Sequence, residues 1–370
     1  MNKFDDDHDK LILASNNNKN PEPKNEIFIF TLFKKKFCKI INKLIFIYIC
    51  LFCLHISLYF KLRKTYVYLN KNKKNKSKID FNQTSKLNIA LCTMGKGENL
   101  YAKEFVDYYL KLGIDHIFIY DDNDPNTEKF TDVIGQTYKD VTIFENIKDK
   151  IRHQSTAFTD CYERNKLKYD WFLMIDMDEF LYLEEDNNIK EYISNHVFDK
   201  CDFIKFHWAH STDNGLVHYD NRSLFERFKP PYLSEHFVKT MIRGNISELE
   251  YWVHSPLLSP IKNISCFNNG EIINKKKVII ESIDPVNFDK AILIHFRYKS
   301  TEEFIAKYKR GYSDWLGDSL KDVLNSHVNV YFEQNKITLE KINYMEKELK
   351  INLWNIRLKY YISKILFFGL

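Results

Sequence analysis

The stretch YDWFLMIDMDEFLYLEE, residues 169–185, places carboxylates directly after a buried apolar run. Residues 171–175 are five apolar residues in a row, enough for a buried strand, and Asp176, Asp178 and Glu179 follow at once. Like charges a few ångströms apart repel one another and lose hydration, so stability alone does not favour this cluster. The pattern therefore predicts a compensating positive charge at the end of the strand.

Length and composition indicate a globular protein with an unusual N-terminal part. The chain has 370 residues, of which 44% are hydrophobic and 28% charged, enough for one large or two ordinary domains with an apolar core. The net charge of +5 comes largely from lysine-rich stretches before residue 80. That distribution is typical of a solvated linker, and we expect no nucleic acid partner.

The N-terminal part divides into three predicted segments. Residues 1–36 are polar and rich in Asn, Lys and Asp, which predicts a disordered tail. Residues 44–60 carry no formal charge and predict a transmembrane anchor within residues 37–64, followed by a stem over residues 65–85. A cleaved signal peptide would need a start at the N-terminus and a small-residue cleavage site, and this segment has neither.

The orientation of the anchor does not follow from charge, because lysines flank the apolar segment on both sides. Five N-x-S/T sequons all follow the segment, which favours a luminal C-terminal part and a type II anchor. They begin at Asn75, Asn82, Asn221, Asn245 and Asn263. Four cysteines of the globular part allow two disulfides in an oxidising compartment, and buried free thiols are an equal alternative. These are Cys92, Cys161, Cys201 and Cys266.

From about residue 86, short apolar runs alternate with amphipathic stretches. This order indicates an α/β fold over residues 86–300, with a mostly parallel, doubly wound, Rossmann-like sheet flanked by helices. A helical extension covers residues 301–370, and its apolar end, residues 361–370, is expected to pack in the helical core because it is too short to span a membrane. Predicted strands are residues 87–93, 114–120, 141–144, 171–175 and 202–208, with helices near residues 101–112 and 152–168.

Two acidic clusters end predicted strands: Asp121 with Asp122, and Asp176 with Asp178. Ligands of a doubly wound sheet bind at the carboxyl ends of its strands. Carboxylate oxygens there can hold Mg²⁺ or Mn²⁺, which usually shares its remaining positions with substrate phosphates. A nucleotide diphosphate is the natural ligand of such a site. The alternative is a solvated turn whose carboxylates face water.

Three blocks of the sequence together resemble glycosyltransferase family 92. They are LNIALCTMGKGENLYAKEFVDYYLKLGIDHIFIYDDND, RHQSTAFTDCYERNKLKYDWFLMIDMDEFL and AILIHFRYKSTEEFIAKYKRG, and they cover roughly residues 87–311. The resemblance implies a nucleotide-sugar-dependent hexosyltransferase of the GT-A fold, with a D-x-D metal site and commonly a type II Golgi anchor. The chain departs from the family pattern at Gly97, where Asn is usual, and at Phe296, where Tyr is usual.

The resemblance also implies roles for particular residues. Asp176 and Asp178 would bind Mn²⁺, or Mg²⁺, that bridges the diphosphate of a donor such as a UDP-sugar, with His295 as a further metal ligand and His254 as its rival. The sugar would pass with inversion to a hydroxyl of a glycan or glycoconjugate acceptor, and the metal would stabilise the departing diphosphate. Glu179 or Asp213 would be the general base. The residues expected to contact the donor are Thr93, Asp121, Asp122, Arg152, Gln154 and Asp176.

Two other classes of protein share part of this pattern. A phosphatase of the haloacid dehalogenase type also carries D-x-D after a strand, but Phe180 stands where that motif needs Thr or Val, and the motif lies mid-chain. A non-enzymatic membrane adhesion protein would explain the anchor and the sequons but leaves the acidic strand ends unexplained. A calcium-binding EF-hand does not fit, because Leu181 stands where its loop requires Gly.

Overall fold

The computed structural model describes most of the chain after residue 86. The predicted tail, anchor and stem of residues 1–85 lie outside the described residues, as does Arg152. Within the described part, no helix is long and apolar enough to cross a membrane. The described residues are 87–135, 137–145, 154–194, 197–247, 249–251, 254–256, 263–274, 281–310 and 320–368.

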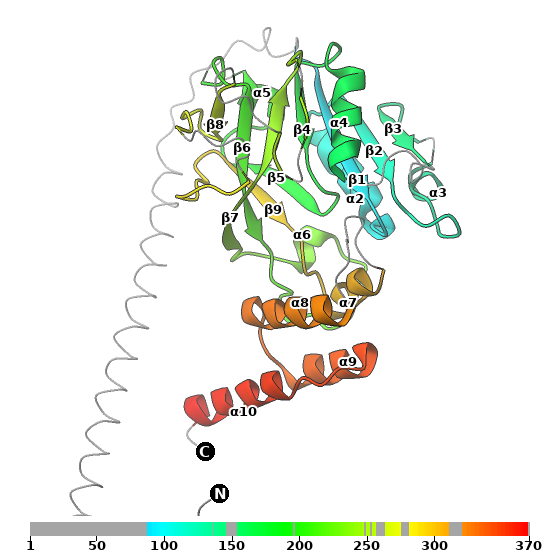
Figure 1. Cartoon of the computed structure of the whole chain (residues 1–370), viewed down its shortest axis with the longest axis vertical. Helices are drawn as coiled ribbons and strands as arrows, with labels where there is room; N and C mark the ends of the chain where they lie inside the picture. The colour runs from blue at the N-terminus through cyan, green and yellow to red at the C-terminus, as the bar shows by residue number, and fades with distance from the viewer. Residues whose placement is uncertain are drawn as a thin grey trace, which may run out of the picture. The chain divides into compact units, whose positions relative to one another are not determined.

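A curled, mixed sheet of nine strands forms the centre of this part of the chain (Figure 1). Its strand order is β3-β2-β1-β4-β7-β6-β9-β5, and β8 pairs with β6. The strands are β1 (Ile89–Gly95), β2 (His116–Asp121), β3 (Val141–Phe144), β4 (Trp171–Met174), β5 (Glu179–Leu183), β6 (Phe203–His210), β7 (Leu233–Arg243), β8 (Ser265–Phe267) and β9 (Ala291–His295).

One half of the sheet is entirely parallel, whereas the other half mixes antiparallel pairs with the parallel pairs of β6 with β8 and β9. Strands β3, β2, β1 and β4 pair in parallel, as expected for strands joined through helices. In the other half, β7 runs antiparallel to both β4 and β6, and β5 runs antiparallel to β9. The α/β class with a mostly parallel sheet is confirmed, and the doubly wound arrangement is limited to the half formed by β3, β2, β1 and β4.

Helices cover both faces of the parallel half (Figure 1). Alternate residues of β1 point to opposite faces: Leu91 packs in the core that includes Phe105 of α2 (Asn99–Leu112), and Ala90 in the core that includes Phe158 of α4 (Gln154–Asn165). Helix α2 ends at Gly113, whose φ of 101° is left-handed and suits glycine. Shorter helices are α3 (Phe130–Ile134), α5 (Ile189–Ile193) and α6 (Leu224–Arg227).

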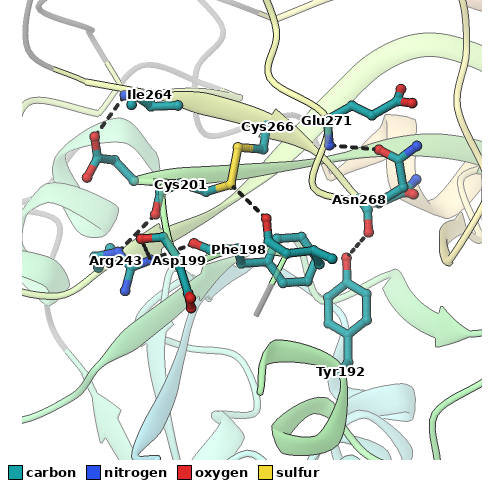
Figure 2. The surroundings of a disulfide bond; sticks show 12 residues. Tyr192, Phe198, Asp199, Cys201, Arg243, Ile264, Cys266, Asn268 and Glu271 are labelled. Carbon is teal, nitrogen blue, oxygen red and sulfur yellow. Dashed lines mark hydrogen bonds between the residues drawn. A yellow bond between two sulfur atoms is a disulfide. The ribbon is translucent and has the colours of Figure 1, made fainter. Parts of the chain in front are cut away.

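The four cysteines of the globular part form two disulfides. Cys92 of β1 joins Cys161 of α4 and so fixes that helix on the sheet. Cys201, two residues before β6, joins Cys266 of β8 (Figure 2). Of the two alternatives left open by the sequence, disulfides and buried thiols, the structure has the disulfides.

Hydrogen bonds fix the chain around the second disulfide (Figure 2). The Arg243 guanidinium donates to the carbonyl oxygens of Cys201, at 2.9 Å, and of Phe198, at 2.7 Å. The Tyr192 hydroxyl donates to the Asn268 carbonyl oxygen at 2.6 Å. These bonds hold β8 and the segment before β6 together at the end of β7 where Arg243 lies.

Four helices follow the sheet: α7 (Thr301–Lys309), α8 (Leu320–Gln334), α9 (Leu339–Leu349) and α10 (Trp354–Phe368). They share a small apolar core that includes Phe304, Tyr331 and Ile342. The prediction that residues 361–370 pack in this core is wrong for residues 361–364, which are exposed. The reason is that α10 packs on α9 through one face, with Ile356 buried, and leaves its other face open.

Candidate functional site

The acidic run after β4 lies at the edge of the sheet where the parallel strands end. In the register, Gly95 of β1 lies beside Asp121 of β2, and Met174 of β4 lies beside Cys92 of β1. The run then turns tightly into β5, because the Glu179 amide donates to the Asp176 carbonyl oxygen at 3.1 Å. Both predicted acidic strand ends therefore lie at the carboxyl edge of the parallel half.

Two lysines supply the positive charge that the sequence predicts beside these carboxylates. The Lys239 ammonium on β7 lies 2.8 Å from Asp176 Oδ1, and the Lys307 ammonium on α7 lies 2.7 Å from Asp178 Oδ2. The Gln154 amide at the start of α4 also donates to Asp176 Oδ1. Each carboxylate thus has its own cation from a distant element.

The ion pairs set the protonation of both aspartates. Burial acts to raise the pKa of Asp176, but the Lys239 charge outweighs it and the pKa lies below its ordinary value. Burial acts in the same direction on Asp178, where the charge of Lys307 and the contact with His295 hold the pKa well below its ordinary value. Both side chains are therefore ionised at neutral pH.

Glu179 has the opposite electrostatic environment. Its side chain is fully buried, and burial together with the nearby charge of Asp176 raises its pKa well above the ordinary value. One carboxyl oxygen accepts the Asp176 amide at 3.0 Å, and the other lies 3.9 Å from the Lys239 ammonium. Glu179 consequently holds its proton more readily than an ordinary glutamate, and its side chain stabilises the turn.

The predicted metal ligands are only partly brought together. His295 Nε2 lies 3.4 Å from Asp178 Oδ1, a separation that suits two ligands of one cation, whereas Asp176 Oδ1 is bound by Lys239 and Gln154. Over the described ranges, no group of three or more His, Cys, Asp or Glu side chains converges as a metal site. Carboxylate and imidazole are donor types that Mn²⁺ accepts, so the types of these residues suit a cation. Their present positions do not form a complete metal site.

The second acidic strand end is occupied by backbone contacts. Asp121 accepts the amide of Asn123 with one oxygen and that of Phe130 with the other, both at 2.8 Å, so this side chain shapes the loop after β2. Asp122 is buried beside it. The Thr93 hydroxyl of β1 is fully buried and has no hydrogen-bond partner among the described residues.

The loop after β1 is bound to the segment around α7. Glu98 is buried and receives the Lys299 ammonium at 2.7 Å and the Arg310 guanidinium at 2.7 Å. Burial alone would raise the pKa of Glu98, but these two cations keep it below the ordinary value. Gly97, where the family usually has Asn, has a left-handed φ of 62°, and its carbonyl oxygen accepts from Arg310.

Asp213 lies in a separate set of contacts. It is buried and binds the Lys341 ammonium and the Tyr331 hydroxyl, which belong to α9 and α8. Its backbone amide donates to the Asn335 side chain at 2.6 Å. These contacts attach the segment after β6 to the C-terminal helices and do not include the acidic run.

Comparison with known proteins identifies the family. The sequence profile of glycosyltransferase family 92 matches residues 85–353. The chain belongs to glycosyltransferase family 92. The resemblance drawn from the sequence blocks is thereby confirmed.

Curated members of family 92 are similar to parts of the chain. A family 92 protein of Ricinus communis is 28% identical over 109 residues, which cover 29% of this chain and 19% of that protein. One from Oryza sativa subsp. japonica is 25% identical over 109 residues, which cover 29% and 18%. One from Arabidopsis thaliana is 22% identical over 240 residues, which cover 62% and 38%. The chain spans less than two fifths of the length of each of these relatives.

The sequence predicted the family 92 carboxylates but missed their cations. The sequence did indicate that Lys239 is unusual, because this charged residue lies within the apolar run FVKTMI. Lys307 and Arg310 lie within the block that carries the resemblance and are three residues apart, which is the spacing of neighbours on one helix face. Their acidic partners could not be read from the sequence, because the pairs are separated by 63, 129 and 212 residues.

Proposed function

We propose that this family 92 chain is a glycosyltransferase of the GT-A fold. It would move a hexosyl group from a nucleotide diphosphate sugar, such as a UDP-sugar, to a hydroxyl of a glycan or glycoconjugate. The observation that carries the proposal is the acidic run at the carboxyl edge of the sheet, with Asp176 and Asp178 bracketed by Lys239 and Lys307. Ligands of open α/β sheets bind at this edge.

The charges at this edge favour a diphosphate ligand. The four cations Lys239, Lys299, Lys307 and Arg310 lie beside the carboxylates of Asp176, Asp178 and Glu98. Burial also lowers the pKa values of His210, to about 2, and of His295, so neither imidazole adds charge at neutral pH. These cations can bind the diphosphate of an anionic donor, whose nucleoside half we assign to the strand ends at Thr93, Asp121 and Asp122.

A divalent cation, Mn²⁺ or Mg²⁺, is part of the proposal. Asp178 and His295 would hold it, together with the oxygen of Asp176 that has no partner among the described residues. When bound, it would supply positive charge that stabilises the departing diphosphate. Lys239 and Lys307 would keep the two carboxylates ionised and hold them in their orientation.

An inverting transfer needs a base that takes the proton of the acceptor hydroxyl. The raised pKa of Glu179 opposes the ionised form that a base needs. Asp213 could act only after releasing Lys341 and Tyr331. Both predicted bases therefore have surroundings that oppose the role.

The proposal places the enzyme in the Golgi or endoplasmic reticulum on a type II anchor. Two disulfides favour an oxidising compartment. The sequon asparagines Asn221 and Asn245 are exposed, as acceptors of glycans must be. The apolar segment at residues 44–60 supplies the predicted anchor.

Donor binding by the full chain in detergent tests the function. We expect one or more members of a panel of UDP- and GDP-sugars to bind more tightly with Mn²⁺ than with a chelator, and one of them to be transferred to glycan acceptors. Asp178→Asn should lose the metal-dependent gain, while Asp220→Asn, which alters an exposed ion pair with Arg222, should keep it.

Other outcomes would decide against the proposal. Phosphate release from small phosphomonoesters without nucleotide binding would favour the phosphatase alternative. Absence of all nucleotide binding would favour a non-enzymatic adhesion protein. Donor binding that is tight in chelator and unchanged by Mn²⁺ would retain the transferase but remove the metal from it.

A further inference from the structure

Strand β7 extends past the end of β4 and carries side chains beside the acidic run. It pairs with β4 only from Thr240 onward, so its first half lies beyond the carboxyl end of that strand. The β6–β7 register shifts within this half, so contacts rather than alternation along β7 place its side chains. The Lys239 ammonium and the Phe237 ring each lie 5.8 Å from the Trp208 ring, and Glu235 Oε1 lies 3.5 Å from Nδ1 of His210, which shares a face of β6 with Trp208. Because Lys239 on this face binds Asp176, the other two side chains border the same site.

Three aromatic rings meet on this face. Phe237 is 44% exposed, and its ring centroid lies 5.8 Å from that of Trp208 on β6 and 5.8 Å from that of His254. The rings of Trp208 and His254 are 5.0 Å apart and nearly perpendicular. We call these three residues the aromatic shelf. A single exposed Phe is ordinary at a protein surface, so this ring alone does not indicate a binding site.

Polar atoms beside the shelf are buried without partners. His210 is only 1% exposed, and neither of its ring nitrogens has a hydrogen bond within the described part of the chain. The Trp208 indole nitrogen, on the shelf itself, is also buried and unbonded there. Buried polar groups in native proteins nearly always have partners, and a missing partner costs about 1–3 kcal/mol. A ligand that carries hydroxyl groups would satisfy these atoms.

A carboxylate is held next to His210. Glu235 Oε1 accepts the Gln334 amide at 3.1 Å and lies 3.5 Å from His210 Nδ1. The His210 imidazole is neutral, so this contact is no ion pair. The second oxygen of Glu235 has no partner among the described residues and is available to a hydroxyl donor.

The shelf is continuous with the donor side of the site. The His295 ring lies 4.7 Å from the Trp208 ring and 4.9 Å from the His210 ring. His295 in turn lies 3.4 Å from Asp178. A group bound on the shelf would therefore adjoin a sugar donor bound at the acidic run.

We propose that the aromatic shelf, with Glu235 and His210, is an acceptor subsite that binds one pyranose ring. This inference rests on the proposed transferase function. A pyranose has an apolar C–H face, which packs on the electron-rich faces of aromatic rings, and a rim of hydroxyls, which bind carboxylate and imidazole. Both kinds of partner lie side by side here.

Saturation-transfer NMR on the full chain in detergent tests the subsite, with UDP and a panel of methyl pyranosides of galactose, glucose, mannose and fucose as probes. We expect at least one methyl glycoside to bind. Phe237→Ala should weaken that binding by about tenfold, and Glu235→Gln should weaken it as well. UDP binding should stay within about twofold of the wild type, because neither side chain contacts Asp176 or Asp178.

Matched variants separate recognition from loss of fold. Tyr182→Ala removes an equally exposed aromatic residue from β5 and should leave glycoside binding unchanged. Phe237→Trp should restore binding because it keeps an aromatic face. If the wild type binds UDP but no glycoside, or if Phe237→Ala binds glycosides as Tyr182→Ala does, the subsite is wrong. Failure of the wild type to bind either UDP or GDP, each added in turn, would instead contradict the transferase itself.

Discussion

At the scale of single residues, the lysines change what the acidic run means for stability. From the sequence, Asp176 and Asp178 are neighbouring like charges that repel in the absence of metal, which predicts that Asp178→Asn leaves the metal-free protein as stable or slightly more stable. The structure reverses this sign. Asp178 binds Lys307 and lies beside His295, so removing its charge takes away a close ion-pair partner of a largely buried ammonium.

We therefore expect Asp178→Asn to lower the free energy of unfolding by about 3 kcal/mol in chelator at pH 7. The folded-state pKa of Asp178 lies well below its unfolded value, so this stabilisation is present above about pH 4 and is lost as the pH falls toward the folded-state pKa. Urea unfolding at pH 7 and pH 3 measures both effects, with Asp220→Asn as the exposed control. An unchanged or greater stability of the variant at pH 7 would restore the interpretation based on repulsion.

Lys205 is a buried lysine outside the acidic run. Its burial lowers its pKa to about 7. Between pH 7 and 10 the unfolded chain binds more protons than the folded one, so stability should rise with pH, by at most about 1.4 kcal/mol per pH unit. Lys205→Met should remove this rise and be more stable at pH 7. Its hydrogen-bond partners, the hydroxyls of Thr240 and Ser255, keep carbonyl acceptors of their own.

Unfolding free energies measured at pH 7, 8 and 9 would show the effect. Lys359→Met, at an exposed position, serves as the control and should keep the wild-type slope. If the unfolding free energy of Lys205→Met changes with pH as steeply as that of the wild type, Lys205 is charged in the folded protein at neutral pH.

At the scale of elements, the sequence predicts β1 to β4 and β6 because each is a short, mainly apolar run separated from the next by a longer segment. The remaining strands escape such reasoning for two physical reasons. Strand β7 has polar side chains among its apolar ones, so the stretch LSEHFVKTMIR has no clear apolar run that would predict a strand. Strand β5 begins directly after the acidic turn, and its partner β9 lies more than 100 residues later in the chain. Pairings between such distant segments are set by the tertiary structure.

The disulfide between β1 and α4 is an element-scale contact with a measurable effect. It closes a loop of 69 residues, which corresponds to about 4 kcal/mol of stabilisation through the unfolded chain. We expect Cys92→Ala combined with Cys161→Ala to lower the free energy of unfolding by this amount. Cys201→Ala combined with Cys266→Ala, across a separation of 65 residues, gives the matched comparison and should have a similar effect. Non-reducing peptide mapping that finds four free thiols would contradict both pairings.

At the scale of the whole molecule, the predicted boundary at residue 300 falls inside the candidate site. Helix α7 belongs to the predicted extension but carries Lys307, the partner of Asp178, and it leads to Arg310, which binds Glu98. The later helices have a core of their own, whereas α7 also contributes to the site. A chain cut before α7 would therefore leave Asp178 and Glu98 buried with fewer cations, which composition alone could not reveal.

The topology of the whole chain across a membrane is tested by its sequons. If the C-terminal part is luminal, the exposed Asn221 and Asn245 should carry glycans in a eukaryotic host, because the acceptor amide must reach the modifying enzyme. Enzymatic deglycosylation should then increase electrophoretic mobility, and Asn221→Gln and Asn245→Gln should each increase mobility by one glycan.

Asn263 is less exposed, and the Ser265 of its sequon is buried, so Asn263→Gln should have the smaller effect. Asn126→Gln, at an exposed position outside any sequon, should migrate as the wild type does. If deglycosylation changes nothing and all variants migrate alike, the type II orientation loses its support, and the disulfides become the only remaining indication of an oxidising compartment.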